Sequence, residues 1–179
     1  SRGLGDVYKR QGKIINFVQE NIPEMNIDST TLSTSYRNNQ IICNLANKMY
    51  PDMEPCDSAM NVKTEHDGIF WIEEKDIDNY METYKPMQLR YDRRTKVNAK
   101  FRVMTFGSAK GLTFDRVLIY PTQPMLTWLS GKSKGLKGES LSKFYVAVTR
   151  AKYSVGFIYK TKKVPSEIIG IKWTPNIDE

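Results

Sequence analysis

Cysteine and histidine are scarce in this 179-residue sequence, which contains Cys43, Cys56 and a single histidine, His66. Three such side chains cannot complete the common four-ligand zinc sites. The sequence has no run of eighteen apolar residues and no apolar segment near its first residue, so it predicts neither a transmembrane helix nor a secretory signal. The two cysteines could pair. A chain of this length can bury its own core, however, so we expect reduced thiols and a cytoplasmic location.

Acidic residues are scarce in the second half of the chain. Residues 1–85 carry a net charge of −5 and residues 86–179 a net charge of +12, which gives +7 for the whole sequence. This asymmetry favours a polyanionic partner, with nucleic acid ahead of a membrane surface. The alternative is a solvated basic surface without a partner. The composition, with 40% hydrophobic and 26% charged residues, is that of a globular domain.

Short strands and helices are predicted to alternate along the chain. The expected strands are 30–35, 68–73, 87–91, 101–106, 116–120 and 153–159, and the expected helices are 14–21, 38–49 (with Asn38 as its cap), 76–84 and 140–151. This order predicts an α/β domain over residues 12–160, with a mainly parallel sheet flanked by helices. Residues 1–11 are expected to be a non-native tail and residues 161–179 a basic C-terminal tail. Residues 130–140 are expected to form a flexible linker.

The helix expected at 140–151 carries a stripe of apolar residues that begins at Leu141. At about 100° per residue, Arg150 lies about 180° from Leu141, so we expect its side chain to point away from the buried stripe. An arginine held between a buried helix and the following strand could bind an anion at a fixed position. The alternative is an ordinary surface arginine near a helix C-terminus.

A second candidate anion site is the small-residue turn between the strands expected at 101–106 and 116–120. Gly107 and Gly111 allow backbone N–H groups to approach an anion, and Lys110 supplies a positive charge. The alternative is a plain turn with a solvated lysine. The turn is not a P-loop, because the pattern Gly-x-x-x-x-Gly-Lys-Ser/Thr is absent.

A third candidate is Tyr36-Arg37, at the end of a predicted strand and just before an amphipathic helix. In this position the aromatic ring could stack on a base and the guanidinium could reach a phosphate. The alternative is a core tyrosine beside a solvated arginine.

Taken together and in this order, the three segments resemble the C-terminal motor domain of superfamily 1 helicases of the UvrD/Rep type. Thr34-Ser35-Tyr36-Arg37 resembles motif IV of that family. Residues 105–114 resemble motif V, usually Thr-x-His-x-Ala-Lys-Gly-Leu-Glu-Phe, and residues 144–151 resemble motif VI, usually Tyr-Val-Ala-x-Thr-Arg-Ala. The resemblance covers residues 29–159 and implies a RecA-like domain of the P-loop NTPase class, in the position of the second motor domain.

The resemblance implies a role at an ATP site for each matching residue. Arg37 and Arg150 would contact the γ-phosphate of ATP, bound with Mg²⁺, and Arg150 would act as the arginine finger. Tyr36 would stack on the adenine. Lys110 and Gly111 would lie beside the nucleotide cleft and couple it to the bound strand.

The resemblance also implies contacts to single-stranded DNA, made by Thr105 and Ser108 to phosphates. The sequence departs from motif V at two positions: Gly107 replaces the usual histidine, and Thr113 replaces the usual glutamate that bonds the ribose. By its position in the motif, the resemblance still assigns Thr113 to the nucleotide site. The direction of translocation is not assigned.

The 179 residues contain no Walker A loop and no Asp-Glu pair for magnesium. We therefore expect an N-terminal RecA-like domain of the same protein to supply both, and we expect this chain alone to hydrolyse no ATP. Residues 38–104 are too few to hold the large domain that UvrD/Rep enzymes usually insert before motif V. The alternative function is a non-enzymatic, basic α/β nucleic-acid-binding module, in which Tyr36, Phe106 and Trp128 stack on bases.

Overall fold

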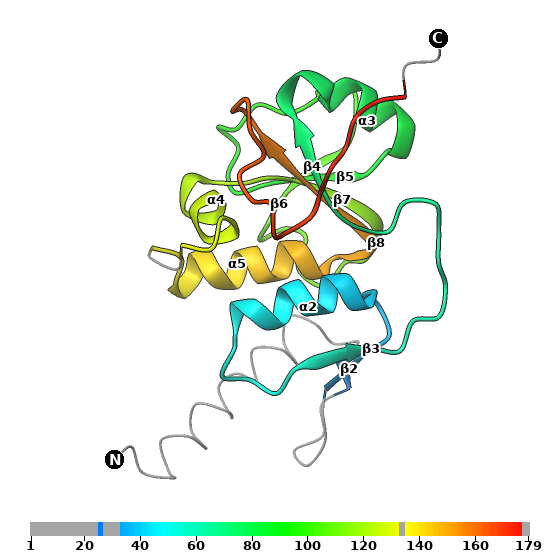
Figure 1. The fold of residues 1–179 in the computed structure, drawn as a ribbon, viewed down its shortest axis with the longest axis vertical. Coiled ribbons are helices and arrows are strands. Elements are labelled where there is room, and N and C mark those ends of the chain that lie inside the picture. Colours follow the sequence, from blue (N-terminus) through cyan, green and yellow to red (C-terminus); the bar gives the residue numbers. More distant parts are fainter. Residues whose placement is uncertain (1–24, 27–32, 133–134, 177–179) are drawn as a thin grey trace.

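The computed structural model describes residues 25–26, 33–132 and 135–176 (Figure 1). The residues predicted as a non-native tail and as a first helix lie outside these ranges. Within them, six strands form a parallel sheet in the order β6-β5-β7-β8-β4-β9. Their bounds are β4 Gly68–Glu73, β5 Met87–Arg90, β6 Val103–Thr105, β7 Phe114–Tyr120, β8 Ala151–Tyr159 and β9 Ile171–Lys172.

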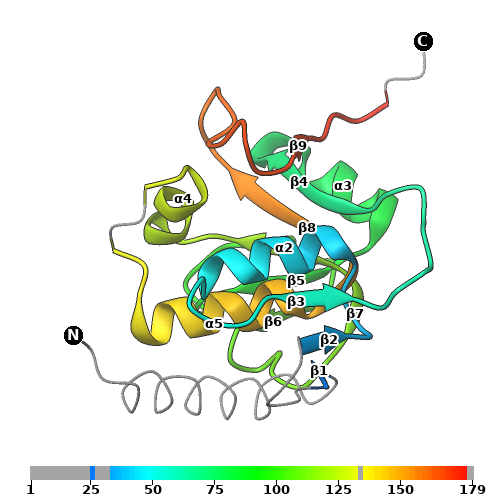
Figure 2. The same ribbon diagram turned by 60° about the horizontal axis from the view of Figure 1, so that its bottom comes forward.

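The two faces of this sheet bury separate apolar clusters. Helices α2 (Gln40–Met49) and α5 (Gly138–Thr149) lie side by side on one face, where Trp71 and Phe157 are buried (Figures 1 and 2). The short helix η1 (Glu74–Asp76) leads into α3 (Ile77–Tyr84), which covers Ile72 and Ile158 on the other face. Strands that are buried on both faces need continuous apolar runs, which is why β4 and β8 were predictable.

A smaller sheet carries the segment that resembles motif IV. Strand β2 (Ser33–Ser35) pairs antiparallel with β1 (Met25–Asn26) and parallel with β3 (Cys56–Ser58). Cys43 on α2 faces Cys56, with 4.0 Å between the two Sγ atoms, and both thiols are free. These contacts pack α2 between the small sheet and the large one. No helix among the described residues is long and apolar enough to cross a membrane.

The structure differs from the predicted elements in several places. Asn39, and not Asn38, caps α2, because its side chain accepts a hydrogen bond from the N–H of Ile42 at 3.0 Å. Helix α4 (Gln123–Leu129) was not predicted, and α5 begins at Gly138, inside the segment predicted as a linker. The segment predicted as a basic tail contributes β9 to the large sheet, next to β4.

Candidate functional site

The three motif-like segments meet at the turn Thr149-Arg150-Ala151, between α5 and β8. Asn38 donates hydrogen bonds from Nδ2 to the carbonyl oxygens of Thr149 and Ala151, at 2.9 and 2.7 Å. Arg37 donates from Nη1 to the carbonyl oxygen of Thr149 at 3.3 Å. The segment after β2 is therefore bonded to the end of α5, more than a hundred residues further along the chain.

A serine turn at the end of β2 aims these two side chains at α5. The Ser35 hydroxyl accepts hydrogen bonds from the N–H groups of Arg37 and Asn38, at 3.3 and 3.1 Å, and donates one to Asn38 Oδ1 at 3.0 Å. This local bonding bends the chain sharply after the strand. Sequence reasoning missed the bridging role of Asn38: the spacing Ser35-x-x-Asn38 signals the local turn, but not the bond to the end of α5.

We expect Asn38→Ala to lower the free energy of unfolding of the 179-residue chain by about 2 kcal/mol, because it removes two buried hydrogen bonds to the carbonyl oxygens of Thr149 and Ala151. Urea denaturation measures this difference. The matched control is Asn44→Ala, which removes an exposed amide on α2 whose Oδ1 accepts a hydrogen bond from Gln40; its effect is expected to stay within about 0.5 kcal/mol. Equal effects of the two substitutions would contradict the bridging role of Asn38.

The Arg150 side chain is fully buried and bonded on three sides. It donates from Nε to the carbonyl oxygen of Val146 at 3.0 Å, from Nη1 to that of Leu112 at 3.3 Å, and from Nη2 to Thr149 Oγ1 at 3.4 Å. Its own carbonyl oxygen accepts from the N–H of Phe114 at 2.8 Å. The segment that resembles motif V is thus bonded to Arg150 through both its side chain and its backbone.

The alternative of an ordinary surface arginine near the helix C-terminus is wrong, because Arg150 is fully buried. Helix α5 ends at Thr149, so Arg150 is the residue after the helix and its side chain folds back over the last turn. There its guanidinium hydrogen-bonds to a helix carbonyl, as basic side chains often do at this position.

The exposure of Tyr36 and Arg37 is the opposite of the alternative stated for them, a core tyrosine beside a solvated arginine. The ring of Tyr36 is 63% exposed, whereas the Arg37 side chain is buried. Burial, followed by the charge of Arg150, lowers the pKa of Arg37 to about 9. Burial likewise lowers the pKa of Arg150 to about 10, although Tyr145 opposes this shift. Two buried guanidinium groups that repel each other form a site in which an anion such as phosphate is favoured.

The turn that follows β6 presents polar groups to solvent. Thr105 Oγ1 donates to Ser108 Oγ at 2.8 Å and accepts from the N–H of Ser108 at 3.3 Å, which orders the turn. Lys110 and Thr113 are exposed, and Gly111 has a φ of +79°, which favours glycine. This turn leads from Thr105 to Leu112, whose carbonyl oxygen accepts the hydrogen bond from Arg150 Nη1.

The predicted phosphate and DNA contacts lie at opposite edges of the large sheet. Arg150 precedes the first residue of β8, which pairs with Phe114 at the amino end of β7. Thr105 pairs with Arg90, which also pairs with Tyr120 at the carboxyl end of β7. The structure therefore groups Arg37 with Arg150 and separates Thr105 from them.

Residues 72–162 match the sequence profile of the UvrD-like helicase C-terminal domain family, which is just over half of the chain. The chain belongs to this family. Its architecture confirms the predicted fold class, an α/β domain with a mainly parallel sheet flanked by helices. A comparison with curated proteins finds no match.

Solved helicase structures resemble this UvrD-like domain only loosely. They include nsp10 helicase of PRRSV (24% identity, TM-score 0.44, covering 72% of this chain and 23% of nsp10) and its methylated form (22%, 0.46, covering 74% and 24%). Arterivirus nsp10 in complex with DNA is a third (20%, 0.42, covering 72% and 25%). The domain spans about a quarter of the length of these helicases. At such TM-scores the likeness adds nothing to the family assignment, which rests on the profile match.

Proposed function

We propose that this UvrD-like domain is the second motor domain of an ATP-dependent DNA helicase, in which Arg37 and Arg150 contact the γ-phosphate of ATP. One observation carries the proposal: hydrogen bonds bring the segments that resemble motifs IV, V and VI together at Thr149-Arg150-Ala151. Converging guanidinium groups suit phosphate oxygens, because their forked N–H groups match them in geometry and charge.

The residues present fit the triphosphate end of a nucleotide. Arg37 and Arg150 supply buried cations, while the exposed ring of Tyr36 is available for stacking on adenine. Lys110, Gly111 and Thr113 would border the same cleft. Bound ATP with Mg²⁺ supplies the phosphoryl group that is transferred to water. We propose that an N-terminal RecA-like domain of the same protein supplies the magnesium ligands, because the sequence contains no Walker motifs.

Contact with phosphate would require Arg150 to change its hydrogen bonds. Its Nη1 group would leave the carbonyl oxygen of Leu112, which follows Gly111 in the turn after β6. That turn begins at Thr105 and Ser108, which we propose as contacts to DNA phosphates. A single loop therefore joins the proposed ATP site to the proposed DNA contacts. Closure of the ATP site would move those contacts.

We expect Lys110→Ala in the intact helicase to lower DNA-stimulated ATP turnover by one to two orders of magnitude, at about 1.4 kcal/mol per factor of ten. Lys110 is the exposed cation of the loop that joins the two sites. Steady-state ATPase assays with and without DNA measure the change. Lys63→Ala, which removes an exposed lysine elsewhere in the chain, is the control and should keep wild-type turnover. An unchanged rate for Lys110→Ala would remove this residue from the mechanism.

The charge distribution also favours a second candidate, a nucleic-acid-binding module that needs no ATP. Residues 86–179, with a net charge of +12, would bind the phosphate backbone in either case. Fluorescence anisotropy with a labelled single strand distinguishes the two functions. A strand affinity of the intact protein that changes with a non-hydrolysable ATP analogue supports the motor, and one that does not change supports the module. We propose a cytoplasmic location, which the free thiols of Cys43 and Cys56 support.

A further inference from the structure

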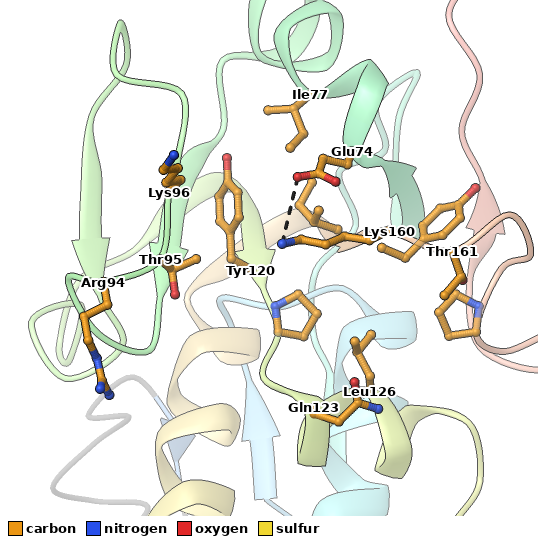
Figure 3. A pocket seen from close by; sticks show the side chains of 14 residues that line it. Glu74, Ile77, Arg94, Thr95, Lys96, Tyr120, Gln123, Leu126, Lys160 and Thr161 are labelled. Atoms are coloured by element: carbon orange, nitrogen blue, oxygen red, sulfur yellow. Dashed lines mark ion pairs between the residues drawn. The ribbon is translucent and has the colours of Figure 1, made fainter.

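A cavity of about 540 Å³ opens at the carboxyl edge of the large sheet, away from Arg150. Its floor is formed where β7 and β8 end, near Tyr120 and Tyr159. Figure 3 shows Arg94 and Lys96 of the β5–β6 loop on one side and Lys160 on another. Ligands of open parallel sheets bind outside the carboxyl ends of the strands, and this volume is typical of ligand pockets.

The charged residues that line the cavity are three cations and one acid. Lys160 Nζ lies 3.9 Å from Glu74 Oε1, and Arg94 Nη2 lies 2.9 Å from Asp92 Oδ2, outside the lining. The Arg94 and Lys160 side chains are 91% and 77% exposed. Exposed ion pairs of this kind contribute little to stability, so a phosphate can replace either carboxylate. The charge of the cavity therefore favours an anionic ligand.

The interior of the cavity is apolar. Ile77 of α3, Leu126 of α4 and Ile158 of β8 line it together with Pro121. A small inorganic anion would leave these side chains uncovered, whereas a nucleotide has a flat base for the interior and phosphates for the rim. The cations come from two segments, the β5–β6 loop and the residue after β8, and remain in solvent. This arrangement suits the spaced phosphates of a strand better than the single cluster of a free nucleotide.

The cavity lies on the same edge of the sheet as the proposed DNA contacts. Thr105 at the end of β6 is level with Arg90 and Tyr120. We infer that the cavity binds one nucleotide unit of a single strand, with the base against Leu126 and the flanking phosphates at Lys96 and Lys160. The choice of a strand as the ligand rests on the proposed function. The inference extends the proposed path of the nucleic-acid strand along the sheet, from β6 across β5 and β7 to β8.

Fluorescence anisotropy of a labelled dT oligonucleotide with the 179-residue chain tests this inference. We expect Lys96→Ala/Lys160→Ala to weaken binding about tenfold near 0.1 M salt and to reduce the slope of log affinity against log salt by about 1.4, since each single-strand contact contributes about 0.7. The control Lys48→Ala/Lys63→Ala makes the same change in charge outside the cavity and should weaken binding less than about twofold. An oligonucleotide with abasic positions should bind the wild type at least about fivefold more weakly.

Equal effects of the two double variants would overturn the inference, because binding would then follow net charge alone. Full-strength binding by Lys96→Ala/Lys160→Ala would also overturn it, as would dTMP competing for the cavity while strand affinity stays intact. Thr105→Ala/Ser108→Ala separates this failure from that of the proposed function. If Thr105→Ala/Ser108→Ala binds the oligonucleotide weakly and Lys96→Ala/Lys160→Ala binds it normally, the proposed DNA contacts at β6 stand. Only the extension of the DNA path to the cavity then fails.

Discussion

The intact helicase with Arg150→Ala is expected to lose at least about a thousandfold of its DNA-stimulated ATP turnover, which corresponds to about 4 kcal/mol of transition-state stabilisation. The physical reason is the loss of a guanidinium group that we propose lies where negative charge develops on the transferred phosphoryl group. Measuring kcat and KM for ATP at saturating DNA separates this effect from weaker binding, because the loss is expected mainly in kcat.

Burial of Arg150 makes a control for folding necessary. The side chain bonds to Val146, Leu112 and Thr149, so its truncation also removes structural hydrogen bonds. Arg150→Lys keeps the positive charge but lacks the forked donors, and we expect it to fold with a melting temperature closer to wild type while turnover remains low. A folded Arg150→Lys or Arg150→Ala protein with wild-type turnover would contradict the assignment of Arg150 as the arginine finger.

The 179-residue chain is expected to lose up to about 3 kcal/mol of its free energy of unfolding as the pH falls from 6.5 to 4. The cause is His66, which is 4% exposed and lies between the rings of Phe70 and Tyr84, with centroid distances of 3.7 and 3.8 Å. Its Nε2 atom lies 2.9 Å from the hydroxyl oxygen of Tyr80. Burial, followed by the charge of Arg116, lowers the pKa of His66 to about 4.

The sign follows from proton uptake. Between the folded pKa of His66, about 4, and its ordinary value of 6.5, the unfolded chain binds the proton and the folded chain does not. Stability therefore falls with falling pH in this window, and the loss from this group is complete below pH 4. Glu65 and Asp67 oppose the shift but do not cancel it. Urea denaturation at several pH values, compared with His66→Gln, isolates the contribution. Identical slopes for the two proteins above pH 5 would contradict this account of His66.

The parts of the fold that the sequence predicted are those with a strong local pattern. Strand β4 was predicted at its observed bounds, because Ile69, Phe70, Trp71 and Ile72 form a continuous apolar run. Helix α4 was missed because the sequence from Gln123 to Leu129 is short and contains Pro124, which is tolerated only in the first turn of a helix. Strand β9 has two residues and forms only through its pairing with β4.

The candidate site shows the same division between local pattern and tertiary context. The sequence singled out Arg37, Arg150 and the turn after Thr105 by residue type and order, and the profile match supports the family. The burial of Arg150 and the bridge from Asn38 could not be predicted, because both depend on carbonyl groups contributed by segments distant in sequence. Either Asn38 or Asn39 could cap α2 by residue type. The backbone geometry after Ser35 decides between them, and residue type does not specify that geometry.

The affinity of the intact helicase for a non-hydrolysable ATP analogue, relative to ADP, tests the central claim most directly. Arg37 and Arg150 are proposed to contact the γ-phosphate, which ADP lacks. We expect Arg37→Ala to reduce the preference for the analogue at least about tenfold, while its affinity for ADP changes less than about twofold. The exposed-arginine control, Arg93→Ala, should keep the wild-type preference. An unchanged preference in a folded Arg37→Ala protein would contradict the claim that this domain supplies arginines to an ATP site.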